Sequence, residues 1–205
     1  MCDVLVIAGD ICPATNHSPG FQRRWLAGPF RRWLDAQPAK HVVATLGNHD
    51  FIGEKAPELI PDLRWNLLLD QSVTIEDLNF YGTPWQPRFL DWAFNLDPPE
   101  LAAVHRKIPN ETDVLICHGP PFGFGDTVRS SSRKHLGAQS LTDAIRNIQP
   151  SLAVVGHIHG GRGSYRIGLT TLLNASVLDE GYHPVFRPWL IEMNGPVVTN
   201  VSECQ

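Results

Sequence analysis

Four short runs of mostly apolar residues punctuate the first three quarters of the chain, and each run ends in a polar loop. The runs are residues 4–8, 42–46, 113–117 and 152–155. Their length and their β-branched side chains predict buried strands. In open α/β sheets the ligand-binding residues lie in loops at the carboxyl ends of strands. We therefore expect the four polar loops to contribute to one site.

Helical patterns lie between the first two of these predicted strands. The tetrapeptide Arg-Arg-Trp-Leu occurs twice, at 23–26 and at 31–34, with Gly28 and Pro29 between the copies. This arrangement predicts two short helices, the second of which begins at Pro29. Three apolar residues of the second helix have the i, i+3, i+4 spacing of a buried face. They are Phe30, Trp33 and Leu34.

The later part of the chain adds two predicted helices and several strands. Helices are predicted from Pro98 and from Ser140, and a hairpin is predicted over 72–81 with its turn at Glu76 and Asp77. From Leu169 onward the pattern favours strands. Because helices alternate with strands early and no linker or repeat divides the sequence, we predict one α/β domain over residues 1–205.

Composition and charge narrow the classes of partner. The net charge of −4 gives no general attraction to nucleic acid or to an anionic membrane. No apolar segment reaches the roughly 18–20 residues that span a bilayer. Because Cys2 and Asp3 follow Met1 without a basic region, we expect no signal peptide. Four cysteines show no C-x-x-C spacing, and Cys117 precedes a candidate ligand, which favours a reducing compartment. We expect a cytoplasmic protein without a membrane partner.

The basic helical segment leaves two interpretations open. Its four arginines could bind a phosphate-rich partner, or they could form the solvated face of the helices opposite the tryptophans. The solvated face is the favoured interpretation, so we expect no nucleic acid partner. The arginines are Arg23, Arg24, Arg31 and Arg32.

The loops at the four strand ends carry side chains that bind metal ions. Aspartate, asparagine and histidine suit Zn, Mn, Fe or Mg. A pair of histidines, His157 and His159, comes from one glycine-rich loop, and Asp10, Asn48 and His118 follow three other strands. We therefore predict one metal centre built from these five residues. The remaining isolated histidines are predicted to be structural or exposed, namely His17, His41, His105, His135 and His183.

The order of these motifs resembles the calcineurin-like metallophosphoesterase family, and the resemblance covers nearly the whole chain. The motifs are Gly9-Asp10, Gly47-Asn48-His49-Asp50, His118-Gly119-Pro120 and Gly156-His157-Ile158-His159. Three further stretches are similar to the small cap-less branch that includes metallophosphoesterase-domain and cyclic-nucleotide-phosphodiesterase-like proteins. These are Gly82-Thr83-Pro84-Trp85, Gly119-Pro120-Pro121 and Asn174-Ala175-Ser176. The resemblance implies two packed mixed β-sheets flanked by helices, a four-layer α/β/β/α sandwich.

The resemblance also implies roles for individual residues. Asp10 would bridge two divalent metal ions. Asn48, His118 and His157 would complete the second metal site, and His159 would bind the first metal. His49 would stay off the metals and act as general acid on the leaving group, and Asp50 would hold the orientation of the His49 ring. The implied reaction is attack of a metal-bound hydroxide on a small phosphodiester or phosphomonoester, and the narrower resemblance favours the diester.

One motif of the family is absent. The family carries an Asp-x-His on a strand before the Gly-Asp motif, and these 205 residues contain no Asp-x-His. We expect an N-terminally incomplete domain whose first strand is missing, with the motif within roughly 15–30 residues upstream of Met1. The chain as given would then bind about one ion. The alternative is a catalytically impaired binding module or scaffold, because Asp10 and His159 alone make a weak first metal site.

Overall fold

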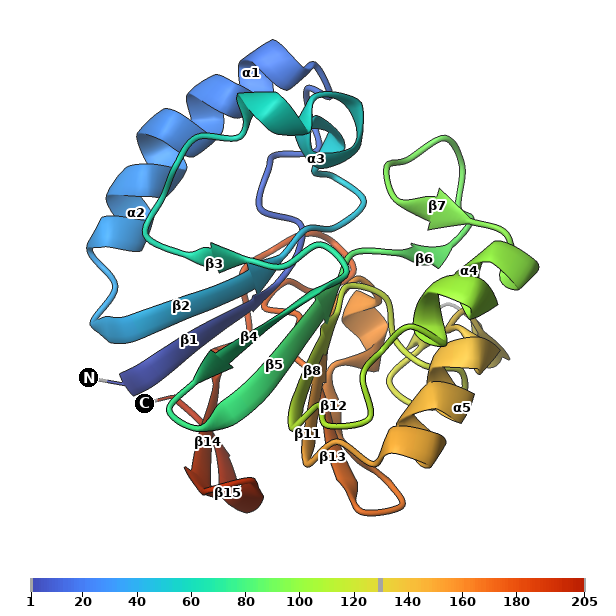
Figure 1. The fold of residues 1–205 in the computed structure, drawn as a ribbon. Coiled ribbons are helices and arrows are strands. Elements are labelled where there is room, and N and C mark those ends of the chain that lie inside the picture. The colour runs from blue at the N-terminus through green and yellow to red at the C-terminus, as the bar shows by residue number, and fades with distance from the viewer. Residues whose placement is uncertain (1, 129–130, 205) are drawn as a thin grey trace.

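The computed structural model describes residues 2–128 and 131–204. The main body consists of two β-sheets that pack face to face, with helices on both outer faces (Figure 1). The helices, including short π and 3₁₀ segments, are α1 (Pro19–Trp25), η1 (Leu26–Phe30), α2 (Arg31–Asp35), α3 (Phe51–Lys55), η2 (Pro57–Leu59), α4 (Pro98–His105), α5 (Gln139–Ile148) and η3 (His159–Gly161).

In the described part of the chain, strands form the two central sheets of the fold and three further two-stranded pairs. They are β1 (Cys2–Ala8), β2 (Ala39–Thr45), β3 (Asn66–Leu67), β4 (Gln71–Ile75), β5 (Leu78–Thr83), β6 (Gln86–Pro87), β7 (Asn95–Leu96), β8 (Val114–Cys117), β9 (Thr127–Val128), β10 (Ser131–His135), β11 (Leu152–Val155), β12 (Gly163–Ile167), β13 (Thr170–Asn174), β14 (Trp189–Asn194) and β15 (Val197–Glu203). The smaller sheet has the order β1-β2-β3 and the larger has the order β12-β13-β11-β8-β5-β4. Strands β14 and β15 form a separate hairpin at the end of the chain.

The strand pairing explains why the polar loops meet. Strands β1, β2 and β3 are parallel, and the central strands β5, β8, β11 and β13 of the larger sheet are also parallel. The outer strands β4 and β12 run antiparallel to their neighbours, so the larger sheet is mixed. Parallel strands place all their carboxyl ends at one edge of a sheet. The loops after β1, β2, β8 and β11 therefore lie at a shared edge of the sandwich (Figure 1).

Apolar side chains fill the space between the layers. Val43 of β2, Ile116 of β8 and Leu173 of β13 are fully buried between the two sheets, together with side chains of the β14–β15 hairpin. Helices α1, α2 and α3 cover the outer face of the smaller sheet, and α4 and α5 cover that of the larger sheet. The predicted α/β sandwich flanked by helices is confirmed, with the difference that the smaller sheet is parallel rather than mixed.

The helical segment after the first strand differs from the prediction of two separate helices. The chain stays helical from α1 through the π segment η1 into α2, and Pro29 lies inside the π segment. The wider π turn accommodates the residue that lacks an N–H donor. Leu26, Phe30 and Leu34 recur every four residues and face the sheet, which turns Trp33 outward, where it is 47% exposed. The predicted burial of Trp33 was wrong.

The remaining elements agree with the patterns in most places. The β4–β5 hairpin turns at Glu76 and Asp77, whose φ angles of 49° and 61° are those of a tight hairpin turn. Strand β12 and the β9–β10 pair were not predicted. Within the described residues, we find no helix with the length and apolarity that crossing a membrane requires.

Candidate metal centre

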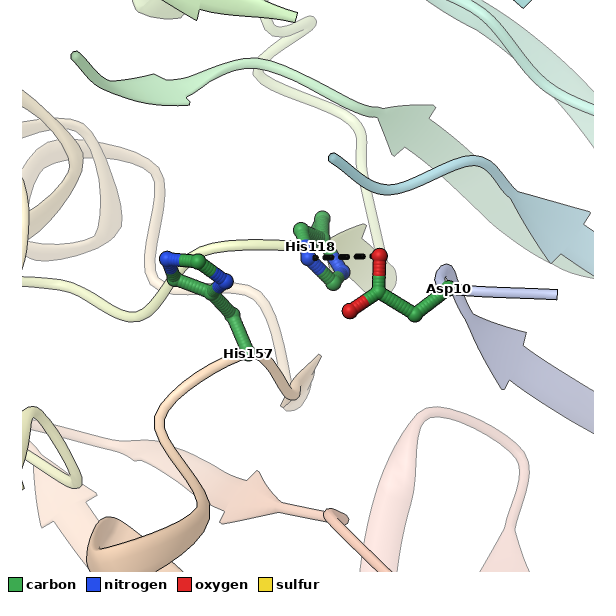
Figure 2. Close-up of side chains that lie close together, drawn as sticks. All are labelled: Asp10, His118 and His157. Carbon is green, nitrogen blue, oxygen red and sulfur yellow. Dashed lines mark ion pairs between the residues drawn. The ribbon is translucent and has the colours of Figure 1, made fainter. Parts of the chain in front are cut away.

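The predicted ligands come together at the shared edge of the two sheets. Asp10 follows β1 and Asn48 follows β2 in the smaller sheet, whereas His118 follows β8 and His157 follows β11 in the larger sheet. One ligand atom from each of Asp10, His118 and His157 lies within 4.8 Å of the others (Figure 2). Each sheet therefore contributes two of the four candidate donors.

Hydrogen bonding places a proton on Nδ1 of His118. Its Nδ1 lies 2.8 Å from the carbonyl oxygen of Ala8, and because a carbonyl only accepts, Nδ1 carries the proton and donates it. Nε2 of the neutral ring is then an acceptor. It lies 2.8 Å from Oδ1 of Asn48 and 3.3 Å from Oδ1 of Asp10.

Three acceptor atoms at such distances repel one another unless they share a cation. The cation can be a second proton on His118 or a metal ion. A buried imidazole whose other nitrogen donates to a backbone carbonyl is the usual form of a histidine ligand, and carboxylate and amide oxygens complete a set suited to a divalent ion. The residues present therefore fit a metal ion at this position.

Two glycines make this close approach possible. A β-carbon added to Gly47 would lie 2.4 Å from Oδ1 of Asp10, and one added to Gly9 would lie 2.6 Å from Nδ1 of His118. Two of the candidate ligands are themselves held in the left-handed region, Asp10 at φ 55° and His157 at φ 63°. Such backbone conformations are uncommon for residues other than glycine and concentrate at functional sites.

Burial and charge set the protonation of the cluster. Burial raises the pKa of Asp10, but the neighbouring imidazoles of His118, His49 and His157 outweigh it and hold that pKa well below its usual range. Burial lowers the pKa of His118, but the Asp10 carboxylate outweighs burial and the pKa is raised. Burial and the positive charge of His118 lower the pKa of His157 to about 3, so the His157 imidazole is neutral near neutral pH.

His49 lies beside the cluster rather than in it. Its backbone N–H donates to Oδ1 of Asp10 at 3.0 Å, and its ring Nε2 lies 3.8 Å from Oδ2 of the same carboxylate. The backbone carbonyl of His49 accepts a 2.7 Å bond from the buried amide of Gln22 in α1. Gln22 also accepts from the N–H of Ile52, so one side chain holds both sides of the His49 loop. No local sequence signal predicts this contact, which spans about 30 residues.

Asp50 connects the backbone of two loops. Its carboxylate accepts bonds from the backbone N–H groups of Gly47 at 2.8 Å, Ile11 at 3.2 Å and Cys12 at 2.7 Å. It therefore joins the loop after β1 to the loop after β2, and the described hydrogen bonds of Asp50 do not include the His49 ring. Burial and the charge of Asp10 raise the pKa of Asp50 to about 6, and the three N–H groups oppose this rise.

His159 is near the cluster but separate from it. It is not among the described residues whose ligand atoms converge within 4.8 Å. Its Nδ1 donates to the carbonyl oxygen of Asp179 at 2.8 Å, which leaves Nε2 as an acceptor. A cavity of about 460 Å³ opens beside it. The lining residues are His159, Gly160, Arg162, Asp179, Glu180, Gly181, Val185 and Phe186.

The other histidines take up positions outside the cluster. His105 is buried between α4 and α5, His135 pairs with the buried Asp126, and His41 and His183 pair with acids at the surface. His17 stacks on Phe51 with ring centroids 4.2 Å apart. A further aromatic side chain, Trp92, contacts His49; from the sequence, the aromatic run that contains it could either wall a substrate pocket or cover the core.

Comparisons with known proteins agree with the motif order. The sequence model of the calcineurin-like phosphoesterase family matches residues 1–161. Metallophosphoesterase domain-containing protein 1 from Homo sapiens is 33% identical over 222 aligned positions, and so is its counterpart from Mus musculus. The alignment covers 95% of this chain and 65% of either relative, so the chain spans just under two thirds of their length.

Solved structures support the fold. The structure of TT1561 from Thermus thermophilus aligns with a TM-score of 0.61 at 12% identity, covering 98% of this chain and 85% of that one. Phosphopantetheinyl hydrolase from Mycobacterium tuberculosis aligns with a TM-score of 0.52 at 14% identity, covering 85% and 79%. At these identities the likeness concerns the sandwich architecture alone.

Proposed function

Because the chain belongs to the calcineurin-like phosphoesterase family, we propose that it is a metal-dependent phosphoesterase that hydrolyses a small phosphodiester or phosphomonoester. The observation that carries this proposal is the convergence of three acceptors, from Asp10, Asn48 and His118, with His157 beside them. Such a set has little structural purpose without a cation. It suits the charge neutralisation that phosphoryl transfer requires.

The residues divide into metal-holding and proton-moving groups. Asp10, Asn48, His118 and His157 would hold one divalent ion, and Asp10 with His159 would contribute to a second. When bound, the ions would neutralise the phosphoryl oxygens and lower the pKa of the attacking water. His49 lies outside the four donors but within 3.8 Å of Asp10, so its ring can donate a proton to the leaving oxygen.

A second candidate function follows from the position of His159. Since His159 stays outside the cluster, only the site around His118 has a full set of donors in the described chain. With one ion the domain could bind a phosphorylated partner without hydrolysing it. The two functions differ in whether the metal-loaded chain turns over a phosphoester.

Metal analysis and hydrolysis of two nitrophenyl esters test the proposal. We expect about one tightly bound Mn, Fe or Zn ion per chain, and release of nitrophenolate from bis(4-nitrophenyl) phosphate or 4-nitrophenyl phosphate. His118→Ala and His157→Ala should lose the ion and the activity, whereas His41→Ala should keep both. Equal metal content in all three variants would refute the donor assignment, and binding without turnover would favour the second candidate.

A further inference from the structure

The loop between β5 and α4 brings an aromatic side chain to His49. Within this loop, the short strands β6 and β7 pair, and the buried residues Ala93, Phe94 and Asn95 anchor its returning half. The N–H of Ala93 donates to the carbonyl oxygen of Asn48 at 3.2 Å. The loop is therefore attached directly to the segment that carries a candidate metal ligand and His49.

Trp92 is placed by these anchors against the His49 ring. The centroids of the two rings are 4.8 Å apart, with an angle of 30° between the ring planes. Trp92 also contacts His17 at 4.9 Å, and His17 stacks on Phe51 at 4.2 Å. We call Trp92, His17 and Phe51 the aromatic wall. Trp92 is the member that borders the His49 ring, and Phe51, which is 3% exposed, supports His17. Asp10 lies at the Nε2 edge of His49.

The outer part of the same loop is also apolar and open to solvent. Phe89 is 55% exposed and Leu90 is 69% exposed. The side chain of Asn95 forms hydrogen bonds with the backbone of both residues. These hydrogen bonds, and not burial of the two side chains, hold the exposed tip of the loop in place. Exposed apolar side chains that a loop holds in place are typical of binding surfaces.

We infer that the aromatic wall binds the leaving group of the substrate, that Trp92 determines specificity there, and that the preferred leaving group is aromatic. This inference rests on the proposed function, in which His49 faces the leaving oxygen. A group bonded to that oxygen would lie beside His49, and Trp92 borders the His49 ring with the ring centroids 4.8 Å apart. A planar aromatic ring gains most from packing against indole and imidazole rings.

Two methyl phosphodiesters with different leaving groups test the inference. One carries a phenyl group and the other a hexafluoroisopropyl group, whose parent alcohols have similar acidity. Trp92→Ala should lower kcat/KM for the phenyl ester about tenfold or more, mainly through KM, and change the fluoroalkyl ester less than about threefold. Trp92→Phe should retain most of the preference, because it keeps an aromatic ring. Trp33→Ala, which removes an exposed indole from α2, is the matched control and should change neither ester.

A binding measurement separates failure of this inference from failure of the proposed function. Calorimetry with phenylphosphonate and methylphosphonate on the metal-loaded protein should show tighter binding of the phenyl compound, and Trp92→Ala should remove that difference. Equal losses for both esters, or an unchanged phenyl preference in Trp92→Ala, would overturn the inference. If the wild-type chain hydrolyses neither ester, the proposed function fails, and the phosphonate comparison still decides whether the aromatic wall binds an aromatic group.

Discussion

His118 shows how strongly a single side chain of this site is constrained. Its Nδ1 is committed to Ala8, its Nε2 faces two oxygens, and its ring is almost completely buried. Every atom that could bind water in the unfolded chain has a defined partner in the fold. A substitution at such a position removes defined hydrogen-bond partners as well as packing contacts. The glycines beside the candidate ligands are constrained by the same close packing.

Gly47→Ala should disrupt the metal centre. The new methyl group would overlap Oδ1 and the backbone N of Asp10, both within 2.5 Å, and backbone cannot move aside cheaply. We expect loss of tight metal binding and a loss of stability of about 1–3 kcal/mol, the usual cost of overpacking a close-packed site. Elemental analysis and urea unfolding measure the two effects.

Gly20→Ala provides the control for that substitution. Its added methyl group would meet only the flexible end of Arg24 at 3.8 Å, in a helix that favours alanine. Metal content should be unchanged and stability equal or slightly higher. Normal metal content in Gly47→Ala would show that the packing around Asp10 tolerates more than the structure indicates.

His49→Ala should affect substrates according to their leaving groups. A general acid contributes about 10²–10⁴-fold, but only when the leaving oxygen needs a proton. The variant should therefore hydrolyse esters of alkyl alcohols far more slowly and nitrophenyl esters nearly normally. A uniform loss across both kinds of ester would remove His49 from the role of acid, and metal analysis would show whether the loss came from the ligands instead.

The residue scale also marks the limit of sequence reasoning. The identities of Asp10, Asn48 and His118 could be predicted because each lies within two residues of the end of an apolar run. The partners of Asp50 could not, because Ile11 and Cys12 precede it by 38 or more positions and are contacted through backbone groups that any residue would offer. Long-range contacts to the main chain leave no pattern in side-chain type.

At the scale of elements, the predicted strands were more reliable than the predicted helices. Strands β8 and β11 are continuous apolar runs that are buried at every position, as burial on both faces requires, and β1 and β2 contain the shorter apolar runs 4–8 and 42–44. The α1–η1–α2 segment contains glycine and proline, which normally end a helix, yet packing of Leu26, Phe30 and Leu34 on the smaller sheet maintains the helix. Tertiary packing therefore outweighed local preference.

The junction of α4 and α5 should make stability depend on pH. His105 is 1% exposed, its Nδ1 lies 2.8 Å from Oγ of Ser140, and its Nε2 is without a partner among the described residues. Burial lowers its pKa to about 4. In the unfolded chain histidine binds a proton near pH 6.5, so the unfolded state binds more protons between pH 6.5 and 4, and stability falls as the pH falls through that range.

His105→Asn should reduce this pH dependence, because asparagine keeps a polar atom near Ser140 without a titrating ring. Between pH 7 and pH 5 we expect the free energy of unfolding of the wild type to fall by about 2 kcal/mol more than that of the variant. Urea unfolding at the two pH values measures the difference. Parallel losses in both proteins would mean that His105 is already charged in the folded state.

Across the whole molecule, Arg162 connects distant parts of the chain. Its guanidinium donates to the carbonyl oxygens of Ser176 and Arg187 and to the carboxylate of Glu203. It also lies over the ring of Trp189, 4.6 Å from the ring centroid, and its side chain is only 6% exposed. One side chain thus joins the segment after β11 to both strands of the C-terminal hairpin.

Arg162→Met should destabilise the protein by about 2–4 kcal/mol, because the two carbonyl groups and the carboxylate would lose charge-assisted hydrogen bonds. The stability of Arg162→Lys should lie between that of the wild type and that of Arg162→Met, since the compact ammonium of lysine lacks the planar fork with which the guanidinium reaches all three acceptors. The control is Arg166→Met, which removes an exposed arginine with one bond to Thr171 and should cost less than about 1 kcal/mol. Equal midpoints of urea unfolding for Arg162→Met and Arg166→Met would contradict this role.

The division of the donors between the two sheets has a mechanical consequence. Asp10 and Asn48 belong to one sheet and His118 and His157 to the other, and the inner faces are otherwise joined mainly by apolar side chains. An ion held by all four would cross-link the two sheets. Separating the sheets would then require that coordination bonds break, in addition to the loss of apolar contacts. Ions that bind only the folded chain, in which the two sheets are packed together, raise its free energy of unfolding in proportion to the logarithm of their concentration. The force needed to unfold the chain should therefore rise with metal concentration, and chelation should lower it to the value of the metal-free chain.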